Sequence, residues 1–406
     1  MGGYLVVFGV AAAITFVCTP LVRRVAFRVG ALSQPSDRTV HTKPMPTVGG
    51  AAMFVGFLAA MGVASRLPQF REMFHGSSEP AGVILAGGVM FAVGALDDLR
   101  EVSPPAKLAG QVLSGSILSL MGVSMLFFRV PFFDIVVLSP DLAPLVTVLT
   151  VVLFANAINL IDGLDGLAAG IVAIAGMAVF LYSDRLFKDG FLTGANIAPL
   201  IAMIAVGICV GFLPWNFSPA RIFMGDAGAM FLGLLMAVTT ITIGGRADYE
   251  YSGQTFFFFA PLFIPLVILG VPLVDTVFSV VRRVVKRRSF AIADKDHLHH
   301  RLVRLGHGPR RSVVMLWLWT ALLSGLALIP LYTDEGNAYV PVGLLALALG
   351  LYAFFHPGRR SARDARGREL AGPEDGSTGG STGESTGESD AETSPVVDLE
   401  ARRRRA

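Results

Sequence analysis

Carboxylate and amide side chains stand at the ends of several long apolar segments, where they could bind a metal ion or a phosphate. An adjacent pair, Asp97 and Asp98, follows the apolar run 81–96, and Asp226 lies in the small-residue segment MGDAG. The segment NAINLIDGLDG adds further polar residues, among them Asn159, Asp162 and Asp165. Carboxylates at the edge of a hydrocarbon layer are costly and are functional candidates by default. Oxygen ligands of this kind are those that Mg²⁺ prefers.

Each acidic motif also has a structural interpretation. Asn159, Asp162 and Asp165 recur at every third position and would line one side of a helix, whereas the glycines of the same segment predict a tight turn. Asp226 could be the N-cap of the helix that it begins. Asp97 and Asp98 could be solvated loop carboxylates. At a helix end their side chains would diverge by about 100°, so one could face a metal ion and the other a lysine.

A cluster of cationic side chains complements these acids. His297, His299, His300 and Arg301 lie together in the segment DKDHLHHRL. Three histidines suggest zinc, but no cysteine accompanies them, and H-x-H-H lacks the i, i+4 spacing of helical zinc sites. Imidazolium and guanidinium donors that converge on phosphate fit better. Hard oxygen ligands together with cationic donors predict Mg²⁺ and a polyphosphate, and the first loop adds further positive charge through Arg38, His41 and Lys43.

The elements that must position these residues are membrane-spanning helices. Of the 406 residues, 53% are hydrophobic and only 16% are charged, against about 25% charged residues in a soluble domain. A spanning helix needs about 20 mostly apolar residues. The segments that meet this requirement are 4–21, 47–65, 81–96, 106–126, 144–161, 167–183, 196–213, 227–244, 256–275, 313–331 and 339–355. We therefore expect an all-α polytopic membrane protein with about 11 transmembrane helices.

The distribution of basic residues predicts the orientation of these helices. Loops after odd-numbered spans carry most of the lysine and arginine, culminating in the dense set from Arg282 to Arg311. The positive-inside rule then places the N-terminus outside and the C-terminus in the cytoplasm. Every acidic or histidine-rich motif follows an odd-numbered span. We therefore expect all of them at the cytoplasmic face.

The chain divides into a membrane domain and a tail. Residues 1–356 are expected to form a transmembrane catalytic domain with cytoplasmic loops, in which the basic segment 276–288 is an amphipathic helix along the membrane surface. Residues 357–406 are rich in Gly, Ser, Thr and Glu and are expected to be a disordered cytoplasmic tail. The two cysteines, Cys18 and Cys209, lie in apolar runs and predict no disulfide.

The ordered motifs resemble those of the polyprenyl-phosphate N-acetylhexosamine-1-phosphate transferases, a glycosyltransferase family 4 type of bacterial membrane enzyme. The resemblance runs from about Leu32 to Leu305. Its marks are DR…H…P…GG in the first loop, then DD…K ending at Lys107, NAINLIDGLDGLA, FMGDAG and DKDHLHHRL. The superfamily includes the phospho-N-acetylmuramoyl-pentapeptide transferases, but the histidine segment and the eleventh span look like the N-acetylglucosamine branch that initiates teichoic acid or arabinogalactan-type polymers.

The resemblance implies an activity and a set of residue roles. The reaction would transfer GlcNAc-1-phosphate from UDP-GlcNAc to a polyprenyl phosphate, with release of UMP, as the first membrane step of cell-wall glycopolymer synthesis. Asp226 and Asn159 would bind Mg²⁺, with Mn²⁺ as an alternative. Asp97 or Asp98 would orient or deprotonate the lipid phosphate, or join the metal shell, and Lys107 would balance their charge. The remaining implied roles are the uridine side for Asn159, Asp162 and Asp165, uracil stacking for Phe223, the diphosphate for His297, His299, His300 and Arg301, and further phosphate contacts for Lys43 and Thr47.

The expected partners follow from this reaction. They are UDP-GlcNAc, undecaprenyl or decaprenyl phosphate, membrane lipid and a second copy of the chain in a homodimer; nucleic acid is not expected. The expected location is the bacterial plasma membrane, with the active site facing the cytoplasm. The alternatives are a phospho-N-acetylmuramoyl-pentapeptide transferase-like enzyme with another UDP-sugar and, from a different class, a transporter. Transporters place charged groups near the bilayer midplane, often in two repeated halves, whereas these acids lie at helix ends and the sequence has no repeated halves.

Overall fold

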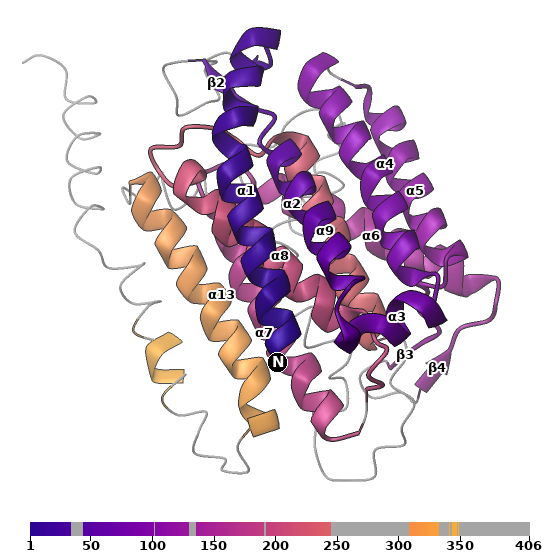
Figure 1. Ribbon diagram of the computed structural model, residues 1–406. Helices are drawn as coiled ribbons and strands as arrows, with labels where there is room; N and C mark the ends of the chain where they lie inside the picture. Colours follow the sequence, from indigo (N-terminus) through magenta and orange to yellow (C-terminus); the bar gives the residue numbers. More distant parts are fainter. Residues whose placement is uncertain are drawn as a thin grey trace, which may run out of the picture. The chain divides into compact units, whose positions relative to one another are not determined.

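The computed structural model of the chain describes residues 1–33, 44–100, 102–129, 135–190, 192–244 and 308–332, and a few residues between 341 and 348. These residues belong to one compact unit, Met1–Ala362. Its helices lie side by side as a bundle (Figure 1). The predicted ninth span, the amphipathic segment 276–288 and the tail lie outside the described residues, as does most of the eleventh span.

Helices form where the sequence is apolar, and each of the first eight predicted spans and the tenth has a helical counterpart. The long helices are α1 (Gly2–Val29), α2 (Gly50–Ala64), α4 (Glu79–Arg100), α5 (Pro104–Leu120), α6 (Leu142–Ile161), α7 (Leu167–Lys188), α8 (Ala198–Asn216), α9 (Gly225–Gly244) and α13 (Pro309–Tyr332). Within the described part, seven helices are long and apolar enough to cross a membrane, or eight with α2 and its continuation counted as one span. The structure thus confirms a mostly helical, multi-pass architecture, while the total of about 11 remains a prediction.

Two helices depart from a simple span. After α2 the chain turns by 90° into a short segment made of η1 (Pro68–Phe70) and α3 (Arg71–Gly76). The fixed φ of Pro68 suits the first position of this new helix, where the backbone needs no N–H donor. Helix α5 has 17 residues, slightly fewer than the usual length of a span.

Helix α9 lies at the centre of the described bundle. It packs against α2, α4, α6, α7 and α8, and nearly all of its side chains are buried. Small residues allow this close packing: a Cβ atom added at Gly94 of α4 or at Gly50 of α2 would collide with the backbone of α9. The first residues of α9 therefore lie among the ends of several neighbouring helices.

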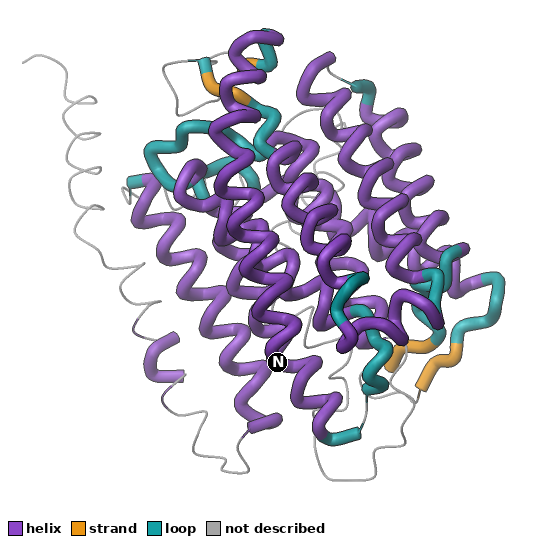
Figure 2. Tube along the Cα trace, in the orientation of Figure 1, coloured by secondary structure: helices purple, strands orange, loops and turns teal. Residues whose placement is uncertain are grey.

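Short antiparallel strands, which the sequence did not predict, connect some of the helices (Figure 2). Strand β1 (Leu32–Ser33) pairs with β2 (Met45–Pro46), and β3 (Phe127–Arg129) pairs with β4 (Ile135–Val137). The β1–β2 ladder sets the position of the segment that leads into α2. Backbone hydrogen bonds then tie this segment to the loop before α9: Phe223 N–H donates to Pro46, and Gly49 N–H donates to Phe223.

Candidate active site

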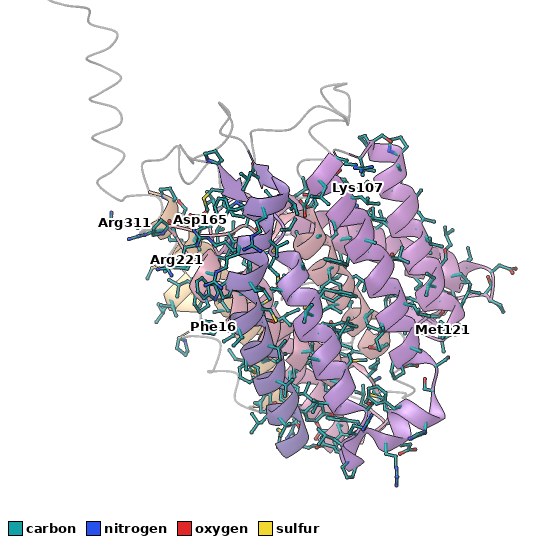
Figure 3. All side chains as sticks on the ribbon, turned by 45° about the horizontal axis from the view of Figure 1, so that its top comes forward. Phe16, Lys107, Met121, Asp165, Arg221 and Arg311 are labelled. Carbon is teal, nitrogen blue, oxygen red and sulfur yellow. The ribbon has the colours of Figure 1, made fainter. Side chains whose placement is uncertain are left out.

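The site is built around Lys107, one turn into α5. Its Nζ lies 2.8 Å from Oδ2 of Asp97 on α4 and 2.5 Å from Oδ2 of Asp226 on α9. All three side chains are partly buried, so their charges interact more strongly than they would in bulk water. One cation therefore joins two carboxylates from helices that are far apart in the sequence. Figure 3 places Lys107 at one end of α5 and Met121 at the other; we call the end with Lys107 the site end of the bundle.

Asp98 has a different role from its neighbour Asp97. Its two carboxylate oxygens accept hydrogen bonds from the backbone N–H groups of Asp226 (2.9 Å) and Ala227 (3.2 Å). These N–H groups belong to the first turn of α9, where no carbonyl of the helix itself is available. Asp98 thus caps α9 from another helix, and its charge complements the positive end of the α9 dipole. The side chain of Asp226 is left to face Lys107 and Asn159.

Gly225 makes this arrangement possible. It has a φ of +70°, in the left-handed region that glycine tolerates best. A Cβ atom at this position would collide with the carboxylate of Asp98 and with the backbone carbonyl of Thr47. Glycine therefore allows the first loop and α4 to approach the start of α9 together.

Thr47, expected to contact phosphate, lies beside this turn. Its Oγ1 is buried and has no hydrogen-bond partner among the described residues. Phe223, expected to stack on uracil, is partly buried in the loop before α9 and is held through its backbone to Pro46 and Gly49. The structure therefore brings Thr47 and Phe223 to the same end of the bundle as Lys107.

The three residues of NAINLIDGLDG that were expected at the site, Asn159, Asp162 and Asp165, have different surroundings. Asn159, in the last turn of α6, donates from Nδ2 to Oδ2 of Asp226 at 3.4 Å. Asp162 follows the end of α6, where burial raises the pKa of its carboxyl group well above the usual range, and the negative charges of Asp226 and Asp98 add to this increase. Asp165 accepts a hydrogen bond from the Ala220 N–H (3.0 Å) and so holds the loop between α8 and α9. Of the three, only Asn159 is helical, because α6 ends at Ile161; Asp162 and Asp165 lie in the turn that the glycines predicted, so the interpretation of all three on one side of a helix is wrong.

Asn216 is a residue of the site end that the sequence reasoning missed. It is buried at the end of α8, where its Oδ1 accepts from Gly166 N–H (3.0 Å) and its Nδ2 donates to the Ile222 carbonyl (3.1 Å). It therefore links the turn after α6 to the loop before α9. The only signal for Asn216 in the sequence is that a polar residue follows an apolar span. Many ordinary loop residues have the same position, so this signal does not identify a functional residue. Asp165 and Arg221 lie near each other at this end (Figure 3).

The donor atoms at the site suit a hard cation. Asp97, Asp98 and Asp226 together can carry more negative charge than Lys107 can neutralise, and Asn159 adds an amide. Such oxygen donors are typical of Mg²⁺ sites. In this conformation Nζ of Lys107 occupies the space between Asp97 and Asp226, and among the described residues no three His, Cys, Asp or Glu side chains are arranged to hold a metal ion. The set fits Mg²⁺ in chemistry and in charge.

Within the described part of the chain, the acidic motifs gather at one end of the bundle, as expected. Apart from Lys107, the predicted cationic residues lie outside the described residues: Arg38, His41, Lys43, His297, His299, His300 and Arg301.

Comparison with known proteins identifies the family. Residues 80–244 match the model of glycosyl transferase family 4. The chain is 36% identical to the decaprenyl-phosphate N-acetylglucosaminephosphotransferase of Mycolicibacterium smegmatis, over 82% of this chain and 84% of the relative. It is 35% identical to the probable undecaprenyl-phosphate N-acetylglucosaminyl 1-phosphate transferase of Bacillus subtilis, over 77% and 81%. It is 26% identical to the undecaprenyl-phosphate alpha-N-acetylglucosaminyl 1-phosphate transferase of Escherichia coli K12, over 82% and 85%. The chain belongs to glycosyl transferase family 4, together with these polyprenyl-phosphate N-acetylglucosamine-phosphate transferases.

Proposed function

We propose that this protein transfers GlcNAc-1-phosphate from UDP-GlcNAc to a polyprenyl phosphate. A phosphate oxygen of the lipid attacks the sugar-bearing phosphorus of the donor and forms a new P–O–P bond. The bond between that phosphorus and the oxygen of UMP breaks, and UMP leaves with the electron pair. The products are polyprenyl-diphospho-GlcNAc and UMP. The names of the relatives support the sugar and the carrier, and either decaprenyl or undecaprenyl phosphate would serve.

The observation that carries the proposal is Lys107 held between Asp97 and Asp226 at the end of a membrane bundle. Two phosphate groups repel each other as they approach, so the site must offset negative charge before the bond can form. Lys107 supplies a positive charge, and its two carboxylate partners hold it at the site until the phosphate arrives. The position of the cluster at helix ends suits a reaction between a lipid headgroup and a water-soluble nucleotide sugar.

Mg²⁺ is the cofactor that we propose, held by Asp226 and by the side-chain oxygen of Asn159. When bound, it would withdraw charge from the phosphate oxygens and orient the diphosphate. Asn159 now directs its amide nitrogen to Asp226, so this role requires the amide to rotate by about 180°. The two ends of an amide differ little in size, which makes such a rotation compatible with the same packing.

Asp97 is our candidate for contact with the lipid phosphate. Both oxygens of Asp98 are engaged by the backbone of α9, which makes Asp98 a positioning residue. Asp97 accepts from Val102 N–H (2.9 Å) and from Lys107. Release of Lys107 towards the incoming phosphate would free an oxygen of Asp97 to take the acceptor's remaining proton. Asp162 and Phe223 are assigned to the nucleoside, and the segment His297–Arg301 to the diphosphate.

We also propose that the site end faces the cytoplasm of a bacterial cell. The support is the excess of Lys and Arg in the loops after odd-numbered spans. The same loops carry the acidic motifs, so the nucleotide sugar would enter from the cytoplasm.

The test is an assay of the purified protein with Mg²⁺, undecaprenyl or decaprenyl phosphate, and a panel of UDP-sugars. We expect UMP and a lipid-linked diphosphosugar from UDP-GlcNAc, and neither product without the lipid phosphate. Release of UDP instead of UMP would contradict phosphosugar transfer. Turnover only with UDP-MurNAc-pentapeptide would instead assign the protein to the muramoyl branch.

A further inference from the structure

A pair of amide side chains lies one helical turn deeper in the bundle than the charged cluster. Asn156 of α6 donates from Nδ2 to Oε1 of Gln111 on α5 at 2.7 Å, and Gln111 donates from Nε2 back to Oδ1 of Asn156 at 3.4 Å. Gln111 is only 1% exposed. The second donor contacts are also present, from Gln111 to the sulfur of Met230 (3.3 Å) and from Asn156 to the carbonyl of Val152 (2.7 Å). The pair is therefore well satisfied inside an apolar bundle.

The two amides and their neighbour Met230 lie at helical spacing from residues of the site. Gln111 lies four residues after Lys107, Asn156 lies three before Asn159, and Met230 lies four after Asp226. Residues three or four apart share one face of a helix. Helices α5, α6 and α9 therefore meet in two layers: the charged cluster at the site end and, beneath it, a layer made of Gln111, Asn156 and Met230, which we call the amide layer.

We propose that Gln111 and Asn156 are positioning residues, whose reciprocal hydrogen bonds set the rotation and register of α5 against α6 so that Lys107 and Asn159 reach Asp226 together. This proposal rests on the proposed function. Apolar side chains alone discriminate poorly between helix registers in lipid, because lipid tails are as apolar as leucine. The amide pair satisfies its donors and acceptors in this arrangement, and a buried polar contact is a known means of fixing register. Both residues act through Lys107 and Asn159 and need not touch substrate.

A double-variant experiment separates positioning from stability. In Gln111→Leu and in Asn156→Leu, one amide stays buried without its partner, so both variants should lose thermal stability and kcat. The double variant Q111L/N156L leaves neither amide unpaired, so its thermal stability should return close to that of the wild type. Its kcat should still fall by about 10-fold or more, because small displacements of positioned groups are costly. KM for UDP-GlcNAc should change much less.

Two further variants sharpen the comparison. The exchange Gln111→Asn with Asn156→Gln keeps one long and one short amide at the contact and should restore most of the kcat lost in Q111L/N156L. Ser114→Ala is the matched control on α5, because Ser114 donates only to the Gly110 carbonyl of its own helix (3.0 Å). It should leave kcat and thermal stability near the wild-type values.

A second measurement does not depend on turnover. In the full-length protein in detergent, the rate at which an amine-acylating reagent modifies Lys107 can be followed by mass spectrometry. The two carboxylates that hold Lys107 should make it slow to react, and Q111L/N156L should raise this rate several-fold. Lys188, paired with Asp184 on α7, is the internal control and should not change.

The outcomes distinguish the two proposals. No UMP release by the wild type would contradict the proposed function, while the Lys107 labelling would still test the positioning role. A double variant with wild-type kcat and wild-type Lys107 labelling would show that the amide pair is merely structural and would overturn the inference. The expected result is wild-type stability with a lowered kcat and a more reactive Lys107.

Discussion

Asp97 and Asp98 are adjacent in the chain but serve different helices. Asp97 faces α5 through Lys107, whereas Asp98 reaches across to the first turn of α9. Hydrogen bonds from backbone N–H groups to a carboxylate are charge-assisted and are worth about 1.5–3 kcal/mol each when both partners are removed from water. A pair of acidic residues in this position can thus contribute both a reactive group and the anchor that fixes a second reactive group, Asp226.

Asp226→Asn should abolish UMP release without lowering thermal stability. The amide keeps the shape of the side chain but loses the charge that pairs with Lys107 and that a hard cation prefers. Asp98→Ala is the contrasting variant: it removes the cap of α9 and should lower the free energy of unfolding by about 1–3 kcal/mol. The measurements are UMP release across a Mg²⁺ titration and thermal unfolding in detergent. Near-normal turnover of Asp226→Asn at low Mg²⁺ would move the metal assignment to Asp97 or Asp98.

The raised pKa of Asp162 predicts a pH dependence of stability. Folded Asp162 holds its proton to a higher pH than the unfolded chain does, where the carboxyl pKa is about 3.9. Between the two pKa values the native state binds more protons, so the free energy of unfolding should fall as the pH rises through this window and then level off. Thermal melts in detergent with EDTA would measure this. Asp162→Asn should flatten the slope, and an unchanged slope would contradict the shift.

For individual residues, the sequence predicted which side chains belong to the site better than it predicted which side chains they contact. Lys107, Asn159 and Asp226 were expected at the site, and the structure places them in contact. The division of labour between Asp97 and Asp98 could not be predicted, because it depends on where α9 begins relative to the end of α4. Gln111 and Asn216 gave no signal that distinguishes them from other isolated polar residues in or beside a span. Their partners lie 45 and 50 residues away in the sequence.

Helix α4 approaches α9 where glycine removes the side chain between them. A Cβ atom at Gly94 would collide with the backbone of Ala227 and Asp226, immediately below the Asp98 cap. Dispersion and close backbone contact are main sources of helix association in lipid. The close contact at Gly94 therefore keeps α4 near enough to α9 for Asp98 to accept hydrogen bonds from its two N–H donors.

Gly94→Ala should separate α4 from α9, lower thermal stability and reduce UMP release. Overpacking a close contact typically costs about 1–3 kcal/mol. Gly88→Ala on the same helix is the matched control, because the nearest atom to its Cβ would be Cζ of Phe54 at 3.8 Å, an ordinary contact. It should be neutral or slightly stabilising. Equal losses in both variants would show that α4 is sensitive to any substitution of glycine and that the α4–α9 contact is not special.

The elements themselves were largely predictable, and their ends were not. Hydropathy located the described spans, but α1 continues to Val29 and α4 to Arg100, beyond the apolar segments that end at 21 and 96. Charged residues can remain helical at a membrane boundary because their polar heads reach water, so the loss of hydropathy does not end the helix. The 90° turn after α2 and the two β ladders depend on local turn geometry and on pairing across loops, which periodicity does not reveal.

The order of the helices determines which motifs can meet. Because α9 is central, its N-terminus is reached by the end of α4, the start of α5 and the end of α6. The sequence predicted that the motifs share one side of the membrane, since they all follow odd-numbered spans, but it gave no information on which helices are neighbours. The site therefore depends on the whole bundle. Asp97, Lys107, Asn159 and Asp226 converge because antiparallel helices return the chain repeatedly to the same end.

This alternation predicts which loops are accessible from outside the cell. Ser103 precedes α5 at the site end, whereas Ser77 follows α3 and Thr193 follows α7 at the opposite end. In a background with Cys18→Ala and Cys209→Ala, single cysteines at Ser77 and Thr193 should react with a membrane-impermeant thiol reagent in intact cells. A cysteine at Ser103 should react only after permeabilisation, because the positive-inside rule places the site end in the cytoplasm. UMP release by each variant in isolated membranes would verify that it is correctly folded. Labelling of Ser103→Cys in intact cells, with Ser77→Cys and Thr193→Cys protected, would invert the orientation and place the lysine–carboxylate cluster on the outer face, where the proposed use of a cytoplasmic nucleotide sugar would fail.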